Sequence, residues 1–256
     1  MRYGWKKDPY FPQLTHTDHL VKMGYDFSKP IPKQVSLEYL LPDVIDQYQV
    51  GRCVGCGIAG NLTARAKEQG VFQEWFSPDW FYNGARYKEG MLSKDEGATP
   101  SDAWDWAVEK GCLLWTAWPC TPKFDKRSPP SEFDPEAAKF PCTGYCRVDN
   151  GVKGLMLALS VGNLISIGTP WPATWEDIGP DGILPDITED TEMVGGHETF
   201  LGGYKEIEGK PYFRDQNSWG KTWADGGRCW MPASAFKVFK LIGGYDSHFP
   251  ILPWKK

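Results

Sequence analysis

The order of local patterns along the chain constrains its fold more than any other feature. Apolar residues recur at helical spacing over 54–69, and helix-start signals stand at Ser77-Pro78-Asp79 and Thr99-Pro100. Strand-like segments come later in the chain, at 164–168, 199–204, 212–215 and 228–231. Helices first and strands second predict an α+β fold built of two unlike halves.

The length and composition fit one large globular domain. With 256 residues, 41% of them hydrophobic and 14% aromatic, the chain can bury a sizeable core and is not disordered. We expect a single domain with three regions. Residues 1–45 are a proline-broken N-terminal extension, 46–115 a mainly helical half, and 116–256 a mainly β half.

Charge and hydropathy exclude several classes of partner. The net charge of −5 disfavours electrostatic capture of nucleic acid. The longest apolar stretch, 155–168, is interrupted by polar residues and falls short of the ~20 apolar residues of a membrane span. The N-terminus has no apolar core of a signal peptide, which predicts synthesis in the cytoplasm.

The cysteines argue against a disulfide framework. An odd number in a chain without a signal sequence is typical of reduced thiols. The seven are Cys53, Cys56, Cys112, Cys120, Cys142, Cys146 and Cys229.

One of the four histidines stands out as a candidate for chemistry. His197 follows Gly195-Gly196 and directly precedes an apolar strand, a position from which a side chain can face a cleft. A buried structural histidine is the alternative. Twenty residues later, Asn217 begins the sequence Asn-Ser-Trp-Gly, in which Asn could also be a simple turn residue.

Cys53-Val54-Gly55-Cys56 allows several interpretations. A C-x-x-C can be a redox pair, or half of a zinc site with Cys142 and Cys146, or two small buried thiols. We expect no metal and no cofactor, because no βαβ context and no nearby histidine accompany the motif. Cys53 lies where a loop meets a helix, and the helix dipole there lowers a thiol pKa.

Taken together, these residues resemble the papain-like cysteine peptidase family. The order Gln47, Cys53, His197, Asn217 matches it, and Cys53 and His197 are separated by the ~130–150 residues typical of the family. Other matching segments are Tyr3-Gly4-Trp5, Phe76-Ser77-Pro78, Gly97-Ala98-Thr99 and Asn217-Ser218-Trp219-Gly220. Only 52 residues precede Cys53, so the resemblance is to bacterial-type members without a long pro-domain.

The spacing to the glutamine decides which cysteine would react. The family's oxyanion glutamine lies six residues before its nucleophile, which gives Gln47 for Cys53 but Val50 for Cys56. The resemblance therefore implies Cys53 as the nucleophile and His197 as its acid–base partner. Asn217 would orient the imidazole under Trp219, and Gln47 would hold the oxyanion.

The resemblance also implies a peptide-binding cleft between the halves. Gly97 and Ala98 would bind the substrate main chain, while Glu198 and Trp219 would border it. Glu198 could also point elsewhere. Tyr48 and Arg52 replace small family residues and are expected to narrow the cleft.

Two further expectations concern a disulfide of the family and the N-terminal segment of this chain. A family disulfide falls on Val50 and Asp95, so that bridge is absent. The proline-broken segment 1–32 would lie over the right half and limit the cleft without filling it, or be a structural belt with no regulatory role.

We therefore predict a thiol protease acting on peptide or protein substrates. Two alternatives stay open. One is a non-catalytic papain-fold component of a larger protein assembly, and the other is an amidase or transpeptidase acting on a non-protein amide.

Overall fold

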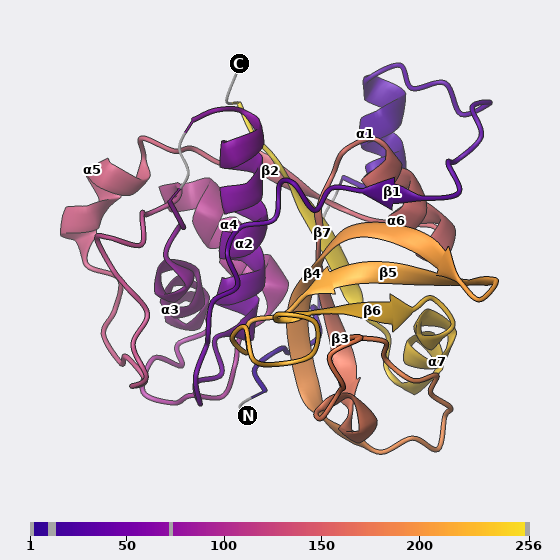
Figure 1. Cartoon of the computed structure of the whole chain (residues 1–256). Helices are drawn as coiled ribbons and strands as arrows, with labels where there is room; N and C mark the ends of the chain where they lie inside the picture. The colour runs from indigo at the N-terminus through magenta and orange to yellow at the C-terminus, as the bar shows by residue number, and fades with distance from the viewer. Residues whose placement is uncertain (1–2, 10–13, 72–73, 254–256) are drawn as a thin grey trace.

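The molecule has a purely helical part and a part built around a sheet with a few short helices, and the two lie side by side (Figure 1). The computed structural model describes residues 3–9, 14–71 and 74–253. The helical part contains α2 (Cys53–Glu68), α3 (Pro78–Lys88), α4 (Pro100–Lys110), the 3₁₀ turn η1 (Ser131–Phe133) and α5 (Asp134–Ala137). The predicted α+β class is confirmed.

Side-chain caps explain where two of these helices begin. Ser77 accepts a hydrogen bond from the Trp80 amide at the start of α3, and Thr99 does the same for Asp102 in α4. A proline occupies the first turn of each helix, where its missing N–H costs nothing. Both starts are those predicted from the sequence.

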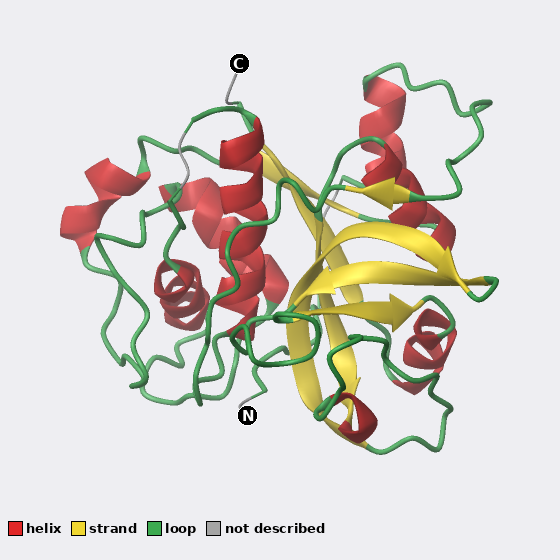
Figure 2. Ribbon diagram, in the orientation of Figure 1, coloured by secondary structure: helices red, strands yellow, loops and turns green. Residues whose placement is uncertain are grey.

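The strands in the described residues form one seven-stranded antiparallel sheet in the order β2-β7-β3-β4-β5-β6, with β1 paired to β4 (Figure 2). Their bounds are β1 (Val35–Ser36), β2 (Gly144–Arg147), β3 (Ile165–Pro172), β4 (Met193–Ile207), β5 (Lys210–Gln216), β6 (Arg228–Pro232) and β7 (Asp246–Ile251). The predicted strands lie in β3 to β6. The pattern did not reveal β2 and β7.

Four shorter elements accompany the sheet. They are α1 (His16–Lys22), α6 (Gly151–Ser160), η2 (Ala173–Trp175) and α7 (Ala235–Ile242). The N-terminal region was expected to be irregular, yet a capping box between Thr15 and Asp18 starts α1. One hydrophobic cluster fills the helical part and another lies around the sheet.

Helix α2 joins the two parts, because its glycines let it approach β4 closely. A Cβ on Gly57 would lie 3.0 Å from Cγ of Glu198, and one on Gly60 would lie 2.5 Å from the Phe200 ring. Asn61 adds a buried hydrogen bond of 3.0 Å to the Leu164 carbonyl. These contacts fix the first half of α2 against the sheet.

Candidate active site

Cys53 is the first residue of α2, and its side chain is fully buried. Backbone groups of Glu198 on β4 and of Gly4 hydrogen-bond its sulfur. Glu198 directly follows His197 in the sequence. The helix and the strand that carry the two candidate catalytic residues therefore meet at this sulfur.

Arg52 does not narrow the cleft, contrary to expectation. Its side chain is 0% exposed, forms an ion pair of 3.1 Å with Asp79 near the start of α3, and donates to the Lys123 carbonyl. The guanidinium therefore points into the helical part and links the start of α2 to α3.

His197 is held by Asn217 and by two tryptophans. Its Nε2 lies 2.7 Å from Oδ1 of Asn217. The Trp219 ring stacks on the imidazole with a centroid distance of 4.7 Å. The Trp171 ring contacts the imidazole in a T-shaped arrangement, with a centroid distance of 4.8 Å. The remaining ring nitrogen, Nδ1, is buried without a hydrogen-bond partner among the described residues.

His197 lies inside β4 rather than before a strand as predicted. The strand begins at Met193, because Gly195 and Gly196 pair with Trp171 and Pro170 of β3. Glycine has low strand propensity, so the sequence pattern placed the start of this strand at residue 199, after the two glycines and His197.

Gln47 is connected to the loop that carries Asn217. The backbone N–H of Gln47 donates to the Ser218 carbonyl at 2.8 Å, and the Ser218 hydroxyl donates to the side-chain Oε1 of Gln47 at 2.7 Å. Nε2 of Gln47 donates to the Val50 carbonyl. The candidate oxyanion residue and the candidate orienting residue thus lie on two loops that are bonded to each other.

The next residue, Tyr48, borders a neighbouring cavity. A cavity of about 370 Å³ is lined by Asp46, Tyr48, Gln49, Pro122 and Trp219. The φ of Tyr48 is 58°, a left-handed conformation that favours glycine. Tyr48 therefore lines this cavity at the cost of backbone strain.

The N-terminal segment lies between the two parts and is bonded to both, which corrects the expectation that it would lie over the right half and limit the cleft without filling it. The amide of Ala98 donates to the Gly4 carbonyl at 2.8 Å, and the Lys6 amide donates to the Ala98 carbonyl at 3.0 Å. On the other side, the amides of Gly4 and Trp5 both donate to the Gly196 carbonyl. Residues 3–6, the cleft segment, are therefore an extended strand bonded to both walls.

Side chains of residues 3–8 add contacts to both parts. Lys6 forms an ion pair of 2.9 Å with Glu89, and Asp8 accepts from the Ser101 amide and hydroxyl at the start of α4. On the sheet side, Tyr3 hydrogen-bonds Glu176. The Tyr3 ring also meets the edges of His197 and Trp219, so it covers the candidate catalytic histidine.

Close packing explains the small residues at Gly97 and Gly4. A Cβ on Gly97 would collide with the Gly4 carbonyl, and a Cβ on Gly4 would collide with the Gly51 carbonyl. Gly97 also has a φ of 83°. The two residues predicted to bind a substrate main chain, Gly97 and Ala98, are thus in contact with the chain's own N-terminal segment.

Burial under this segment leaves both candidate catalytic groups uncharged. Loss of solvent raises the pKa of Cys53 to about 12 and outweighs the lowering expected from the helix N-terminus. Burial likewise lowers the pKa of His197 to about 4, against a smaller opposing effect of the Asn217 hydrogen bond. Both groups are therefore neutral near pH 7 in this structure.

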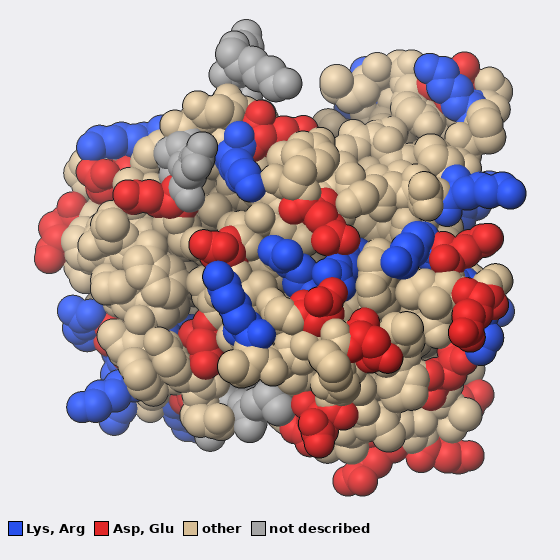
Figure 3. All heavy atoms as spheres, viewed as in Figure 1, with Lys and Arg blue, Asp and Glu red and all other residues tan. Residues whose placement is uncertain are grey.

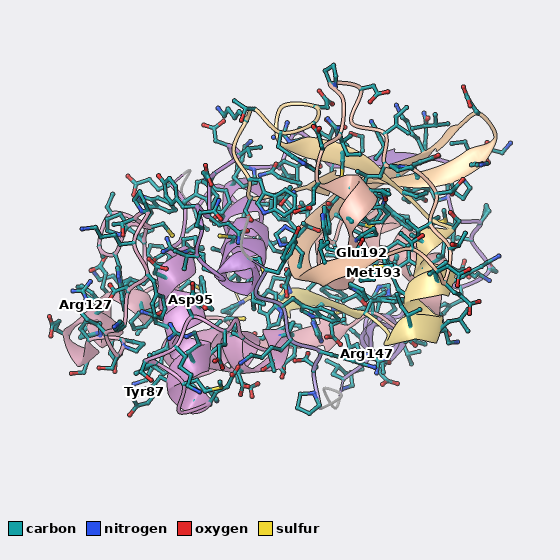
Figure 4. All side chains as sticks on the ribbon, turned by 90° about the horizontal axis from the view of Figure 1, so that it is seen from below. Tyr87, Asp95, Arg127, Arg147, Glu192 and Met193 are labelled. Atoms are coloured by element: carbon teal, nitrogen blue, oxygen red, sulfur yellow. The ribbon has the colours of Figure 1, made fainter. Side chains whose placement is uncertain are left out.

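The other cysteines are buried free thiols. Cys56 lies one turn after Cys53, and burial raises the pKa of its thiol well above the ordinary value. At the expected disulfide position, Asp95 accepts hydrogen bonds from the Gly51 amide (3.0 Å) and the Tyr82 hydroxyl (2.6 Å). Figure 4 labels Asp95 in the helical part. A carboxylate thus links the two loops that a disulfide would join.

No His, Cys, Asp and Glu cluster suited to a metal ion occurs in the part of the chain that the structure describes. The zinc alternative, with Cys53, Cys56, Cys142 and Cys146 as ligands, has no such cluster to support it.

None of the helices within the described ranges has the length and apolarity that crossing a membrane requires. On the face shown in Figure 3, Lys and Arg are scattered among acidic side chains, which gather at its lower right.

Sequence reasoning noticed Tyr3-Gly4-Trp5 but did not place it in the cleft. It missed Glu176 and Asp246 as contacts of this segment. The residues are far apart in sequence, with a separation of 241 positions from Trp5 to Asp246. The sequence marks Tyr3-Gly4-Trp5 as a motif, but a single sequence does not identify the residues that this segment contacts.

The arrangement of α2 against an antiparallel sheet, with Cys53 and His197 at their junction, defines the papain-like cysteine peptidase fold. Xylellain, a cysteine protease from Xylella fastidiosa, superposes with a TM-score of 0.81 and 21% identity over 98% of this chain and 96% of its own. Bromelain protease from Ananas comosus gives a TM-score of 0.66 and 20% identity over 87% of this chain and 100% of its own. Digestive procathepsin L 3 of Tenebrio molitor gives a TM-score of 0.71 and 18% identity over 88% of this chain and 72% of its own. No protein-family model matches the sequence, and no curated protein is significantly similar to it.

Proposed function

We propose that this protein is a cysteine peptidase that hydrolyses peptide bonds and that its own N-terminal segment keeps inactive. Cys53 is the nucleophile, His197 the acid–base group, Asn217 the orienting residue, and Gln47 an oxyanion donor. The observation that carries this proposal is the 2.7 Å contact of His197 with Asn217 beneath Trp219, on a strand whose next residue touches the Cys53 sulfur.

The residues can perform acyl transfer once the cleft segment is displaced. His197 takes the proton of the Cys53 thiol, and the sulfur attacks the substrate carbonyl carbon. The Cys53 amide and the Gln47 side chain donate to the oxyanion. His197 then protonates the leaving amine, and water hydrolyses the thioester to free acid and thiol.

Asn217 supports this chemistry through one oxygen. Its Oδ1 lies 2.7 Å from Nε2 of His197 and accepts from the Ser218 amide at the same distance. Because Nε2 is the donor in that contact, Nδ1 is the nitrogen left to exchange a proton with Cys53. The Trp219 ring keeps water away from the bond.

A thiol-directed epoxide tests the assignment of the nucleophile. The full chain with Trp5→Ala, which weakens the cleft segment, should be labelled once, at Cys53, and should cleave a mixed peptide library. Cys53→Ala in that background should lose both labelling and cleavage, whereas Cys56→Ala should keep both. Loss of labelling in Cys56→Ala with retention in Cys53→Ala would reverse the assignment.

The occupied cleft also fits a papain-fold protein that binds partners without cutting. The same experiment separates the two functions. Labelling at Cys53 without cleavage of any library peptide would favour the binding role.

A further inference from the structure

A cavity of about 480 Å³ borders the residue that directly follows the cleft segment. Three basic side chains from three separate parts of the chain line it, namely Lys7, Arg147 of β2 and Lys240 of α7. Arg147 is labelled on the sheet side in Figure 4, and Lys7 donates a hydrogen bond to the Gly243 carbonyl just after α7. Positive charges that converge on one hollow attract anions, and we call this site the basic cavity.

The two carboxylates at the wall of the basic cavity are bonded to the N-terminal extension. Asp149 accepts from the Thr17 amide at 3.1 Å and from the Thr17 hydroxyl at 2.6 Å. Asp246 accepts from the Trp5 indole at 3.0 Å and from the Asp8 amide at 2.9 Å. The acids therefore anchor residues 5–17 beside the cavity. Two carboxylates against three basic side chains leave the cavity with a net positive charge.

Some donors of the basic cavity have no partner in the described part of the chain. The Lys240 side chain is exposed and makes neither a hydrogen bond nor an ion pair there. The Tyr245 hydroxyl also lacks a hydrogen bond there, and a Cβ on Gly151 would lie 3.7 Å from it. Burial raises the pKa of Tyr245, so this hydroxyl stays a donor at neutral pH. Gly151 begins α6, which has no side-chain cap, and the first amides of that helix add further donors.

A phosphate group matches this set of donors. It carries close to two negative charges at neutral pH, and its oxygens point in several directions, so cations from three elements can meet it at once. A planar carboxylate presents a single edge and suits one donor fork better. The volume of the basic cavity lies within the roughly 300–1,000 Å³ of small-molecule sites, which leaves room for an organic group attached to the phosphate.

We infer that the basic cavity binds a phosphate group, either free or as the monoester of a small molecule, and that this binding holds the N-terminal segment in the cleft. The inference rests on the proposed function, because it names a ligand that regulates the same cleft. Lys7 lines the cavity while Trp5 and Asp8, on either side of it, are bonded to Asp246. A ligand that contacts Lys7 therefore binds the closed form more tightly and shifts the equilibrium toward closure.

Calorimetry on the full chain measures the binding directly. Inorganic phosphate and glycerol 2-phosphate are titrated separately at constant ionic strength. Lys240→Gln should weaken binding about fivefold or more, because a charge-assisted contact is lost. Lys237→Gln is the matched control, since Lys237 is an exposed lysine of the same helix that does not line the cavity. Tighter binding of glycerol 2-phosphate would identify a monoester as the ligand, and equal or weaker binding would identify the free anion. No saturable binding, or an equal loss in both variants, would reject the site.

Hydrogen exchange measures closure without relying on the chemistry of Cys53. The amides of Gly4, Trp5 and Lys6 are hydrogen-bonded while the cleft segment is in place, so their exchange reports its opening. Saturating amounts of the tighter ligand should slow this exchange at least threefold in the wild-type chain and by a clearly smaller factor in Lys7→Gln. Binding that leaves the exchange unchanged would overturn the link to closure.

Labelling of Cys53 by the epoxide separates this inference from the proposed function. In the full chain with Trp5→Ala, the ligand should slow labelling in parallel with the exchange. Ligand-dependent protection of the cleft segment in a chain that is never labelled and cleaves no peptide would contradict the proposed function and leave the phosphate site standing. Labelling and cleavage that proceed equally with and without bound ligand would keep the proposed function and reject the regulation.

Discussion

The Gly4 carbonyl accepts a 2.8 Å hydrogen bond from the Ala98 amide, directly beside the sulfur of Cys53. The chain's own N-terminus thereby makes the main-chain contacts expected of a bound peptide. This single pairing connects the proposed chemistry with its restraint, because the groups that would bind a substrate are already occupied. The predictions below concern the strength of that restraint and the geometry beneath it.

Trp5→Ala should open the cleft. The substitution removes a partly buried ring and its hydrogen bond to Asp246, and the cost lies below the about 3–5 kcal/mol typical of a fully buried tryptophan. The rate at which an epoxide labels Cys53 should rise at least tenfold, as measured by mass spectrometry over time. Trp5→Phe keeps a smaller aromatic ring but loses the N–H, so its rate should fall in between. An unchanged rate in Trp5→Ala would show that the other anchors suffice to keep the cleft closed.

Asp8→Asn should make opening less dependent on pH. Burial and the nearby Asp246 raise the pKa of Asp8 to about 7 in the closed form, whereas a free Asp has a pKa near ~4. The protonated acid therefore favours closure, which is fully supported below about pH 4 and weakened as the pH rises through 7. Asparagine keeps the acceptor for Ser101 but cannot ionise.

The labelling rate of Cys53 in the two proteins measures this effect. The ratio of wild type to Asp8→Asn should be near one at pH 4 and should rise between pH 4 and 8. His197, with its pKa lowered to about 4, acts in the opposite sense, because burial of the neutral ring favours closure above its ordinary pKa of ~6.5. That contribution and the titration of Cys53 are common to both proteins and cancel in the ratio. A ratio that does not change with pH would contradict the prediction.

The sequence was sufficient for the elements with local signals. The caps at Ser77 and Thr99 and the apolar spacing of 54–69 predicted α2, α3 and α4 nearly to the residue. Strand β7 was missed because Asp246, Ser247 and His248 are polar yet buried, so no alternation of polar and apolar residues marks it. Its burial comes from β2 and β3, which pair with it from distant parts of the chain.

The residues of the candidate site likewise fall into those that the sequence predicted and those that it could not. The residue spacings that resemble the family selected Cys53, His197 and Asn217, and these come from elements that meet at the junction of α2 and β4. The positions of Trp5 and Asp246 could not be predicted, because a three-strand register and a bond between the two ends of the chain bring them together. The expectation for Arg52 failed because its ion pair with Asp79 outweighs the preference of a charged side chain for solvent.

Tyr48→Gly should stabilise the fold or leave it unchanged, although a large side chain is lost. Tyr48 has a φ of 58°, and a non-glycine residue in this conformation costs roughly 1–2 kcal/mol. Its side chain is partly exposed at the rim of the 370 Å³ cavity, so little burial is lost. We expect an equal or higher Tm by calorimetry, with Tyr39→Gly, another exposed tyrosine, as the comparison. A Tm lowered by several degrees would mean that the ring contributes more than the backbone strain.

Asn217→Ala should reduce turnover while leaving the nucleophile in place. Among the described residues, the Oδ1 atom of Asn217 is the only hydrogen-bond partner of the His197 ring, so its loss frees the ring to rotate about its Cβ–Cγ bond beneath Trp219. Misplacing a catalytic group by about 1 Å can cost ~10²-fold in rate, and we expect a loss of that order in kcat with a much smaller change in KM. The measurement uses the Trp5→Ala background, so that opening of the cleft does not limit the rate, and a melting curve verifies the fold. Ser218→Ala, which removes the hydroxyl bond to Gln47 but keeps the backbone amide that binds Asn217, is the matched variant and should lose less. If Asn217→Ala turned over peptide as fast as its parent, His197 would be oriented by Trp219 and Trp171 alone, and the role assigned to Asn217 would be wrong.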